Sequence, residues 1–252
     1  MIPKKIHYCW FGGKPLNALG RRCLDSWKTY FPDYEIICWD ESNSDLTGCR
    51  YVREAYEAGK WAFVSDYVRF KVLYEQGGLY FDTDVEVIRP FDDLLSTAGA
   101  AFMGCENPAG QPLAVNPGLG FAAEAGHALI GELLDDYEHG SFCRPDGTPE
   151  LYTVVERVTA LLRRHGLEDA ARIQDIAGVR VYPTEYFCPI DMNTGKMRIT
   201  ENTHSIHRFA ASWEKPENRL RGKIYMALRR CLGEKAAEGL RRVVGRKGDK
   251  RG

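Results

Sequence analysis

Asp82 and Asp84 are one residue apart and directly follow a short apolar run at 79–81. Because side chains alternate in direction along a strand, we expect the two carboxylates to point the same way and Thr83 to point the opposite way. Carboxylate oxygens are hard ligands that suit Mg²⁺ or Mn²⁺ better than zinc. Solvated aspartates at strand ends are common, so the pair predicts a divalent-cation site only together with its neighbours in the chain.

Asp66 and Arg69 lie within residues 62–76, where apolar side chains recur at helical spacing, and they share one face of that helix. One interpretation is an ordinary surface ion pair, which contributes roughly a few tenths of a kcal/mol. The other is that both side chains point into a cleft. Asp66 would then bind hydroxyl groups, and the planar guanidinium of Arg69 a phosphate or a sugar. The glycine pair at 77–78 ends the helix and leads into the next strand.

Two aromatic positions and a histidine add candidate ligands at either end of the chain's body. Trp10 is either a core tryptophan that closes the first strand or a wall on which a nucleotide base stacks, with the backbone of residues 9–11 contacting the edge of the base. An isolated histidine is more often structural than a ligand. His207 nevertheless follows a strand-like segment and could complete a metal shell, while the indole N–H of Trp213 contacts a phosphate oxygen.

The elements that must position these residues alternate between strands and helices. The predicted strands are 5–11, 34–39, 79–81 continued through 85–88, 100–104, 179–182, 185–187 and 205–209, and the predicted helices are 17–30, 51–76 with a break near Gly59, 126–138 and 151–165. A strand, a helix and a strand within the first forty residues form a βαβ unit. The fold class is therefore α/β, with a mostly parallel central sheet flanked by helices. No linker divides residues 1–216, which we expect to form one domain followed by a tail at 217–252.

Composition excludes several other classes of protein. The 252 residues are 44% hydrophobic and 27% charged, and no apolar run approaches the roughly 18 residues of a membrane span. The chain starts without an export signal, so we expect a cytoplasmic protein. Its eight cysteines include no CxxC pair, and several lie in apolar settings. They predict reduced thiols rather than disulfides or metal knuckles.

The net charge of −1 conceals a basic tail. Residues 219–252 carry twelve Lys or Arg against three acidic residues, which is +9, and the remaining residues therefore carry −10. Apolar side chains recur among these arginines. The tail is either a solvated basic helix or disordered end, or a peripheral helix on the anionic inner face of a membrane. In the second case each basic residue would add about 1 kcal/mol of binding.

The ordered motifs together resemble a known family. In chain order they are residues 2–13 (IPKKIHYCWFGG), 26–27 (SW), 32–35 (PDYE), Trp39, 62–69 (AFVSDYVR), 77–84 (GGLYFDTD) and 207–213 (HRFAASW). This set is similar to glycosyltransferase family 32, the DxD sugar transferases of the capsular-polysaccharide and initiating α-mannosyltransferase type. The glucosyltransferase domains of the large clostridial toxins are more distant relatives. The likeness covers about residues 1–110 and resumes at 207–213, whereas 111–200 departs most from the family pattern.

The resemblance implies a GT-A fold, a nucleotide-sugar donor, a Mn²⁺ or Mg²⁺ ion and retention of the anomeric configuration. It implies that Asp84 ligates the metal directly, that Asp82 contacts the ribose and the metal, and that His207 binds the metal from the far side. The residues assigned to the nucleotide sugar are Cys9, Trp10, Phe11, Asp66, Arg69, Tyr80, Asp82 and Trp213, and those assigned to catalysis are Asp66, Arg69, Asp82 and Asp84.

The predicted function is a retaining hexosyltransferase. It would move a sugar from a UDP- or GDP-sugar to a saccharide or lipid-linked acceptor in surface polysaccharide synthesis, with no nucleic-acid partner. Front-face attack by the acceptor hydroxyl is favoured, and double displacement through a carboxylate stays open. An aspartate-nucleophile phosphatase is disfavoured, because Glu86 stands where such enzymes place Thr or Val. A non-catalytic nucleotide or carbohydrate binder of the same fold is the remaining alternative.

Overall fold

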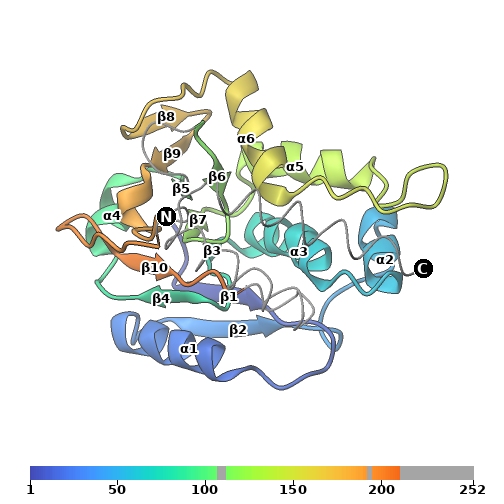
Figure 1. Cartoon of the computed structure of the whole chain (residues 1–252), viewed down its shortest axis with the longest axis horizontal. Helices are drawn as coiled ribbons and strands as arrows, with labels where there is room; N and C mark the ends of the chain where they lie inside the picture. Colours follow the sequence, from blue (N-terminus) through green and yellow to red (C-terminus); the bar gives the residue numbers. More distant parts are fainter. Residues whose placement is uncertain (107–111, 192–194, 211–252) are drawn as a thin grey trace, which may run out of the picture.

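The computed structural model describes residues 1–106, 112–191 and 195–210, and within them two sheets organise the chain. The larger sheet has eight strands in the order β2-β1-β3-β7-β5-β9-β8, with β6 beside β5 (Figure 1). The smaller sheet pairs β4 with β10. Five strands of the larger sheet run in one direction, because β1 is parallel to β2 and β3, β9 is parallel to β5, and β7 is antiparallel to both β3 and β5. The predicted α/β class with a mostly parallel central sheet is confirmed.

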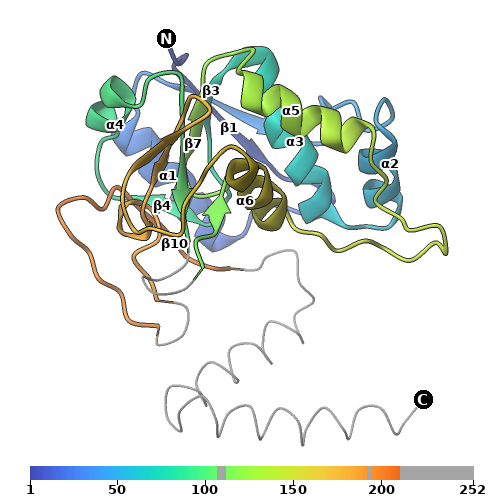
Figure 2. The same ribbon diagram turned by 90° about the horizontal axis from the view of Figure 1, so that it is seen from above.

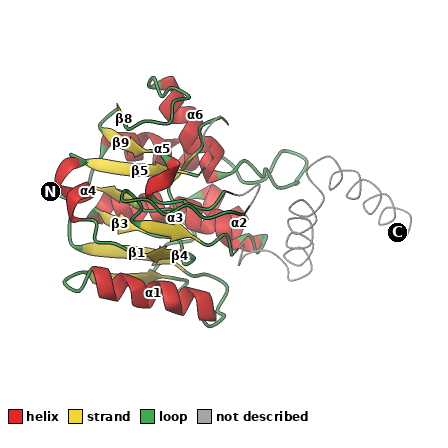
Figure 3. Cartoon of the chain, turned by 60° about the vertical axis from the view of Figure 1, so that its left-hand side comes forward, coloured by secondary structure: helices red, strands yellow, loops and turns green. Residues whose placement is uncertain are grey.

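The strands are β1 Lys5–Cys9, β2 Glu35–Trp39, β3 Gly78–Tyr80, β4 Val85–Val87, β5 Ala101–Cys105, β6 Val115–Asn116, β7 Phe121–Ala123, β8 Gln174–Ile176, β9 Val179–Tyr182 and β10 Ser205–His207. The helices are α1 Ala18–Tyr30, α2 Arg50–Glu57, α3 Trp61–Gln76, α4 Asp92–Thr97, α5 Ala128–Glu138, α6 Val154–Arg164 and the short 3₁₀ helix η1 Thr184–Tyr186. Helices flank the strands (Figure 3), and among the described residues none is long and apolar enough to cross a membrane.

Two hydrophobic cores lie on opposite faces of the larger sheet. Along the chain from 79 to 81, Leu79 and Phe81 join one core and Tyr80 joins the other, as strand alternation requires. The Tyr80 core packs against α2, α3, α5 and α6, and the other packs against α1, α4 and β4. Figure 2 shows α2, α3 and α5 gathered on one side of the strands. This arrangement places α3, which carries Asp66 and Arg69, directly over β1 and β3.

The prediction that one strand runs through residues 79–88 is wrong, because the structure has two strands there. β3 ends at Tyr80, and the chain turns at 82–85, where the Val85 N–H donates to the carbonyl of Asp82 at 3.0 Å. β4 then leaves the larger sheet and pairs antiparallel with β10, His207 lying opposite Val85. Asp82 and Asp84 therefore lie on a turn between two sheets, and strand alternation does not set their directions.

Other boundaries differ less. The helices predicted at 17–30, 51–76, 126–138 and 151–165 all form, with the expected break separating α2 from α3. The strand predicted at 185–187 is wrong, because Thr184–Tyr186 is a 3₁₀ helix. The sequence does not predict β6, β7, β8 or α4. The tail at 217–252 lies outside the described residues. The seven cysteines among the described residues are free thiols.

Ser26 and Trp27, two motif residues of α1, hold the free edge of β4. The indole N–H of Trp27 donates to the carbonyl of Val85 at 2.8 Å, and the Val87 N–H donates to Oγ of Ser26 at 3.0 Å. These side chains bond backbone groups that a neighbouring strand would otherwise bond. Since β10 occupies the other edge, β4 is fixed from both sides.

His7 fixes the backbone that leads to the aspartates. The indole N–H of Trp39 donates to Nδ1 of His7 at 3.0 Å, so the ring proton is on Nε2, which donates to the carbonyl of Gly77 at 2.9 Å. Gly78 has a φ of +111°, and a Cβ there would lie 2.8 Å from the carbonyl oxygen of Lys5. The glycine pair between α3 and β3 is therefore required by both conformation and space.

The buried His7 predicts a pH-dependent stability. Burial lowers its pKa below the ordinary 6.5, so the unfolded chain binds more protons and the stabilisation is present above about pH 6.5 and lost as the pH falls. Between about pH 7 and pH 5 we expect the free energy of unfolding, measured with urea, to fall more for the native chain than for His7→Asn. Equal pH slopes for the two proteins would contradict this assignment.

Candidate functional site

Arg69 on α3 joins the two carboxylates that the sequence singled out separately. Its Nη2 donates to Oδ1 of Asp66 at 2.9 Å and lies 3.4 Å from Oδ1 of Asp82. The side chains of Arg69 and Asp66 are only 4% and 9% exposed, whereas that of Asp82 is 31% exposed. The surface ion-pair interpretation is therefore wrong, and Arg69 is a buried link between α3 and the turn that carries the aspartates.

The strands beneath Arg69 supply the rest of its surroundings. Its guanidinium lies over the ring of Tyr80, 4.7 Å from the ring centroid, and the hydroxyl of Tyr80 contacts the thiol of Cys9 on the neighbouring β1. β1 and β3 are parallel, so their carboxyl ends meet at one edge of the sheet. In open α/β sheets, ligands bind at such an edge.

Burial dominates the electrostatics of this group. It raises the pKa of Asp66 to about 7; the charge of Arg69 opposes that rise, and the charge of Asp82 adds to it. Burial disfavours the charge of Arg69, but Asp82, Tyr80 and Asp66 together raise its pKa above the ordinary value, so Arg69 stays a cation. Its Nη1 is buried and has no hydrogen-bond partner among the described residues. One donor of the guanidinium fork therefore remains for a ligand.

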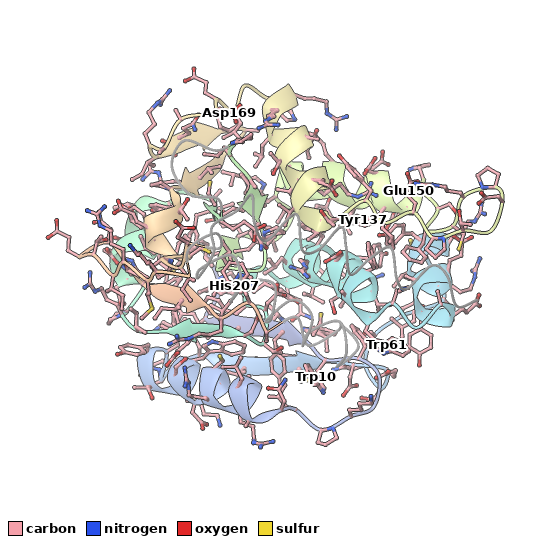
Figure 4. The ribbon with its side chains drawn as sticks, in the orientation of Figure 1. Trp10, Trp61, Tyr137, Glu150, Asp169 and His207 are labelled. Carbon is pink, nitrogen blue, oxygen red and sulfur yellow. The ribbon has the colours of Figure 1, made fainter. Side chains whose placement is uncertain are left out.

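Asp84 belongs to a second group, held by β10. Nε2 of His207 lies 3.4 Å from Oδ1 of Asp84, and the Ala210 N–H donates to Oδ2 at 2.7 Å. Burial opposes the charge on both partners, but their mutual attraction raises the pKa of His207 well above 6.5 and lowers that of Asp84. Figure 4 labels His207 on β10, in front of β4. A histidine 123 residues downstream thus lies beside the second aspartate.

The donor set of Asp82, Asp84 and His207 fits a Mn²⁺ or Mg²⁺ ion. Two carboxylates supply hard oxygen ligands, and an imidazole is an accepted nitrogen ligand of Mn²⁺. The buried Nδ1 of His207 has no hydrogen-bond partner in the described part of the chain, so the ring can turn without breaking a bond there. Across residues 1–106, 112–191 and 195–210, no three His, Cys, Asp or Glu side chains are already gathered around one point. Binding would therefore require these side chains to move.

A turn from the segment that departs from the family pattern fixes Asp82. The Asp82 N–H donates to the carbonyl of Gly118 at 2.9 Å, and the Gly118 N–H donates to Oδ1 of Asn116 at 2.7 Å. Nδ2 of Asn116 in turn donates to Oε2 of Glu106 at 2.6 Å. Sequence reasoning assigned no role to Gly118; its only signal was the Asn-Pro-Gly turn at 116–118.

Gly118 leaves room for the Asp82 carboxylate. A Cβ at position 118 would lie 1.9 Å from Oδ2 of Asp82, which is impossible without moving the side chain. We expect Gly118→Ala to lower turnover by about 100-fold, since a displacement near 1 Å can have that effect. Gly131→Ala is the matched control, because its Cβ would meet only the Tyr74 ring at 3.3 Å. Steady-state kinetics of the two variants measure the difference, and equal activity would contradict this role.

The aromatic assignments at the end of β1 have mixed outcomes. Phe11 is buried in the core, and Trp10 is partly exposed (Figure 4). The Trp10 N–H donates to the carbonyl of Trp39 at 2.9 Å and the indole N–H to that of Lys14 at 2.5 Å, so neither donor is free for a base. The ring face of Trp10 remains the predicted stacking surface. Trp213 lies outside the described residues.

The sequence of this chain matches glycosyltransferase sequences over part of its length. Residues 19–100 match the family model described as a glycosyltransferase sugar-binding region containing a DXD motif. The chain is 30% identical over 148 residues to inositol phosphoceramide mannosyltransferase 3 of Schizosaccharomyces pombe (strain 972 / ATCC 24843), covering 56% of this chain and 38% of the relative. The chain thus spans well under half the length of this relative.

Solved structures give the same kind of likeness at lower identity. One is a glycosyltransferase involved in glycosylation of the major capsid of PBCV-1, with a TM-score of 0.48 at 15% identity, covering 90% of this chain and 100% of that one. Another is the PaToxG glycosyltransferase, with a TM-score of 0.47 at 18% identity, covering 65% and 69%. Residues 19–100, which contain Asp66, Arg69, Asp82 and Asp84, therefore resemble the sugar-binding region of glycosyltransferases that contains a DXD motif.

Proposed function

We propose that this GT-A-type glycosyltransferase is a retaining, metal-dependent hexosyltransferase that takes its sugar from a UDP- or GDP-sugar. The observation that carries the proposal is the buried Arg69 contact to both Asp66 and Asp82. A buried guanidinium with an unpartnered nitrogen, next to a partly exposed carboxylate at the carboxyl ends of β1 and β3, suits a ligand that carries both hydroxyls and phosphate.

Each side chain has a distinct part in this proposal. Asp66 accepts hydrogen bonds from sugar hydroxyls, and Arg69 donates to the sugar or the diphosphate while holding Asp82 in place. Asp82, Asp84 and His207 would hold Mn²⁺ or Mg²⁺, which supplies Lewis-acid stabilisation of the leaving diphosphate when bound. Arg69 adds fixed positive charge where negative charge develops.

The transfer itself needs no nucleophile from the chain. The acceptor hydroxyl oxygen bonds to the anomeric carbon on the face that the diphosphate leaves, and the bond from that carbon to the diphosphate oxygen breaks. The hydroxyl proton passes to the departing phosphate oxygen. This front-face route retains configuration, and double displacement through a carboxylate is the alternative.

The acceptor is proposed to be a saccharide or a lipid-linked saccharide of surface polysaccharide synthesis. Support comes from the relative named inositol phosphoceramide mannosyltransferase 3, whose name combines mannosyl transfer with a lipid acceptor. The basic segment 219–252 would bring the site to the inner face of an anionic membrane, with the protein otherwise cytoplasmic. Deleting 219–252 should abolish binding to anionic liposomes and leave donor hydrolysis intact; unchanged liposome binding would contradict this membrane role.

Thermal unfolding with a panel of UDP- and GDP-sugars, each with and without Mn²⁺ or Mg²⁺, tests the donor proposal. At about 100 times its Kd, a ligand stabilises the folded state by about 2.7 kcal/mol, which is roughly 5–10 °C in Tm for a chain of this size. We expect one donor to give this shift only with metal, followed by turnover with saccharide acceptors. A metal-dependent shift without turnover for any donor would favour the non-catalytic binder, and no shift at all would contradict both.

A further inference from the structure

Arg157 on α6 lies in a box of aromatic rings. Its guanidinium carbon is 4.5 Å from the ring centroid of Tyr137, 5.1 Å from that of Tyr152 and 5.8 Å from that of Tyr51. It also forms an ion pair with Asp136 near the surface. Three rings from three parts of the chain therefore hold one cation in place, and its side chain is only 15% exposed.

This box adjoins the inner side of α3. Tyr137 packs edge-on against Tyr51 at 4.8 Å between centroids, and it contacts the α3 residues Tyr67 and Phe70 at 6.1 and 5.9 Å. Figure 4 labels Tyr137 where α5, α6 and α3 come together. Burial raises the pKa of Asp66, and the charges of both Arg69 and Arg157 oppose the rise.

Unpartnered polar atoms are concentrated in the same place. In the described part of the chain, seven buried side-chain nitrogens or oxygens lack a hydrogen-bond partner. Four of them belong to this cluster: Nη1 of Arg69, Nε of Arg157 and the hydroxyls of Tyr51 and Tyr137. Buried polar groups are normally bonded, so this concentration marks the interior behind Asp66 as built for something other than apolar packing.

We propose that Arg157 is a positioning residue of the donor site, which through its aromatic box against α3 keeps the Asp66 carboxylate directed toward Arg69. The inference rests on the proposed function, because Asp66 and Arg69 are its sugar-binding pair. Charges separated by a dry aromatic interior interact more strongly than charges in water, so the charge of Arg157 adds to this effect without touching Asp66. α6 comes from the segment that departs most from the family pattern, so its support for Asp66 and Arg69 is expected to be particular to this chain. The competing explanation is that the stack of Arg157 on tyrosines only stabilises packing.

Dissociation constants of two ligands separate these explanations. The two ligands are the nucleotide sugar that stabilises the native chain and the matching nucleoside diphosphate without its sugar. The Kd of each is measured by isothermal titration calorimetry in the presence of Mn²⁺. For Arg157→Met we expect the Kd of the nucleotide sugar to rise about tenfold and that of the diphosphate to change less than twofold. Arg157→Lys keeps the charge and should restore sugar binding to within about threefold of native. Arg164→Met, an exposed arginine of the same helix, is the matched control and should bind both ligands as the native chain does.

A folded Arg157→Met protein with native sugar affinity, or one that loses both ligands equally, would overturn the positioning role. If Arg157→Met does not fold, Tyr152 provides the test, since it is 37% exposed and tolerant of change. Tyr152→Leu admits water to the guanidinium and should weaken sugar binding about threefold, whereas Tyr152→Phe should not. Native affinity in Tyr152→Leu would then overturn the role.

Failure of the proposed function has a different signature. If the native chain binds no nucleotide sugar, the proposed donor is wrong. The positioning role of Arg157 is then tested by a crystal structure of Arg157→Met, or of Tyr152→Leu if Arg157→Met does not fold. The expected result there is an Asp66–Arg69 contact opened beyond the 2.9 Å of the native chain. An unchanged contact would overturn the positioning role without any donor.

Discussion

Arg69→Met is expected to reduce turnover by at least roughly 10²–10³-fold and to lower the free energy of unfolding by about 3–5 kcal/mol. The activity falls because the guanidinium is the only side chain seen to contact both Asp66 and Asp82 among the described residues. The stability falls because Asp66 is left buried without its cation, and breaking a buried pair from one side leaves an uncompensated charge. Steady-state kinetics and urea denaturation measure the two effects separately.

Two companion proteins make the Arg69 result specific. Arg172 forms an exposed i,i+4 pair with Glu168, so Arg172→Met should change stability by less than about 0.5 kcal/mol and leave turnover alone. The double variant Asp66→Asn with Arg69→Met removes both charges and should regain part of the lost stability, but none of the turnover. An Arg69→Met protein with native turnover would refute the role of the cation.

Asp84→Asn is expected to abolish the Mn²⁺- or Mg²⁺-dependent thermal shift and to lower turnover about 10³-fold. Asparagine retains the shape and can still accept from the Ala210 N–H, so the fold should survive. It removes one anionic ligand, and loss of about 4 kcal/mol of transition-state stabilisation corresponds to roughly that factor. A native metal response in this variant would show that Asp84 is not a ligand.

The Asp84–His207 pair predicts how metal binding depends on pH. The pKa of His207 is raised beside Asp84, so its contribution to stability is present below about pH 6.5 and lost as the pH rises through the raised pKa. The lowered pKa of Asp84 makes its own contribution present above about pH 4 and lost below it. A ligating imidazole must be neutral, so Mn²⁺ affinity should increase with pH and binding should release a proton. Calorimetry in buffers of different ionisation enthalpy detects that proton, and its absence would exclude His207 as a ligand.

The sequence determined much of the Asp66–Arg69 side of the candidate site, because those signals are local. Helical periodicity placed Asp66 and Arg69 on one face of α3, and the glycine pair marked the passage to β3. The apolar run at 79–81 indicated a buried strand, which the structure places at Gly78–Tyr80. The ordered motifs were enough to indicate the glycosyltransferase family, because each motif lies within a few consecutive residues.

Only the tertiary structure decided how these pieces meet. Local spacing cannot show whether an i,i+3 pair is exposed, and burial turned the Asp66–Arg69 pair from a weak surface contact into the centre of the site. Nor could it show that the chain turns at 82–85 into a second sheet, because β4 is defined by its pairing with β10 more than a hundred residues later. Gly118 lies 36 residues from Asp82, whose carboxylate it makes room for, and Arg157 lies 91 residues from Asp66, whose helix its aromatic box adjoins. Such contacts arise from packing between elements, which residue type and spacing do not encode.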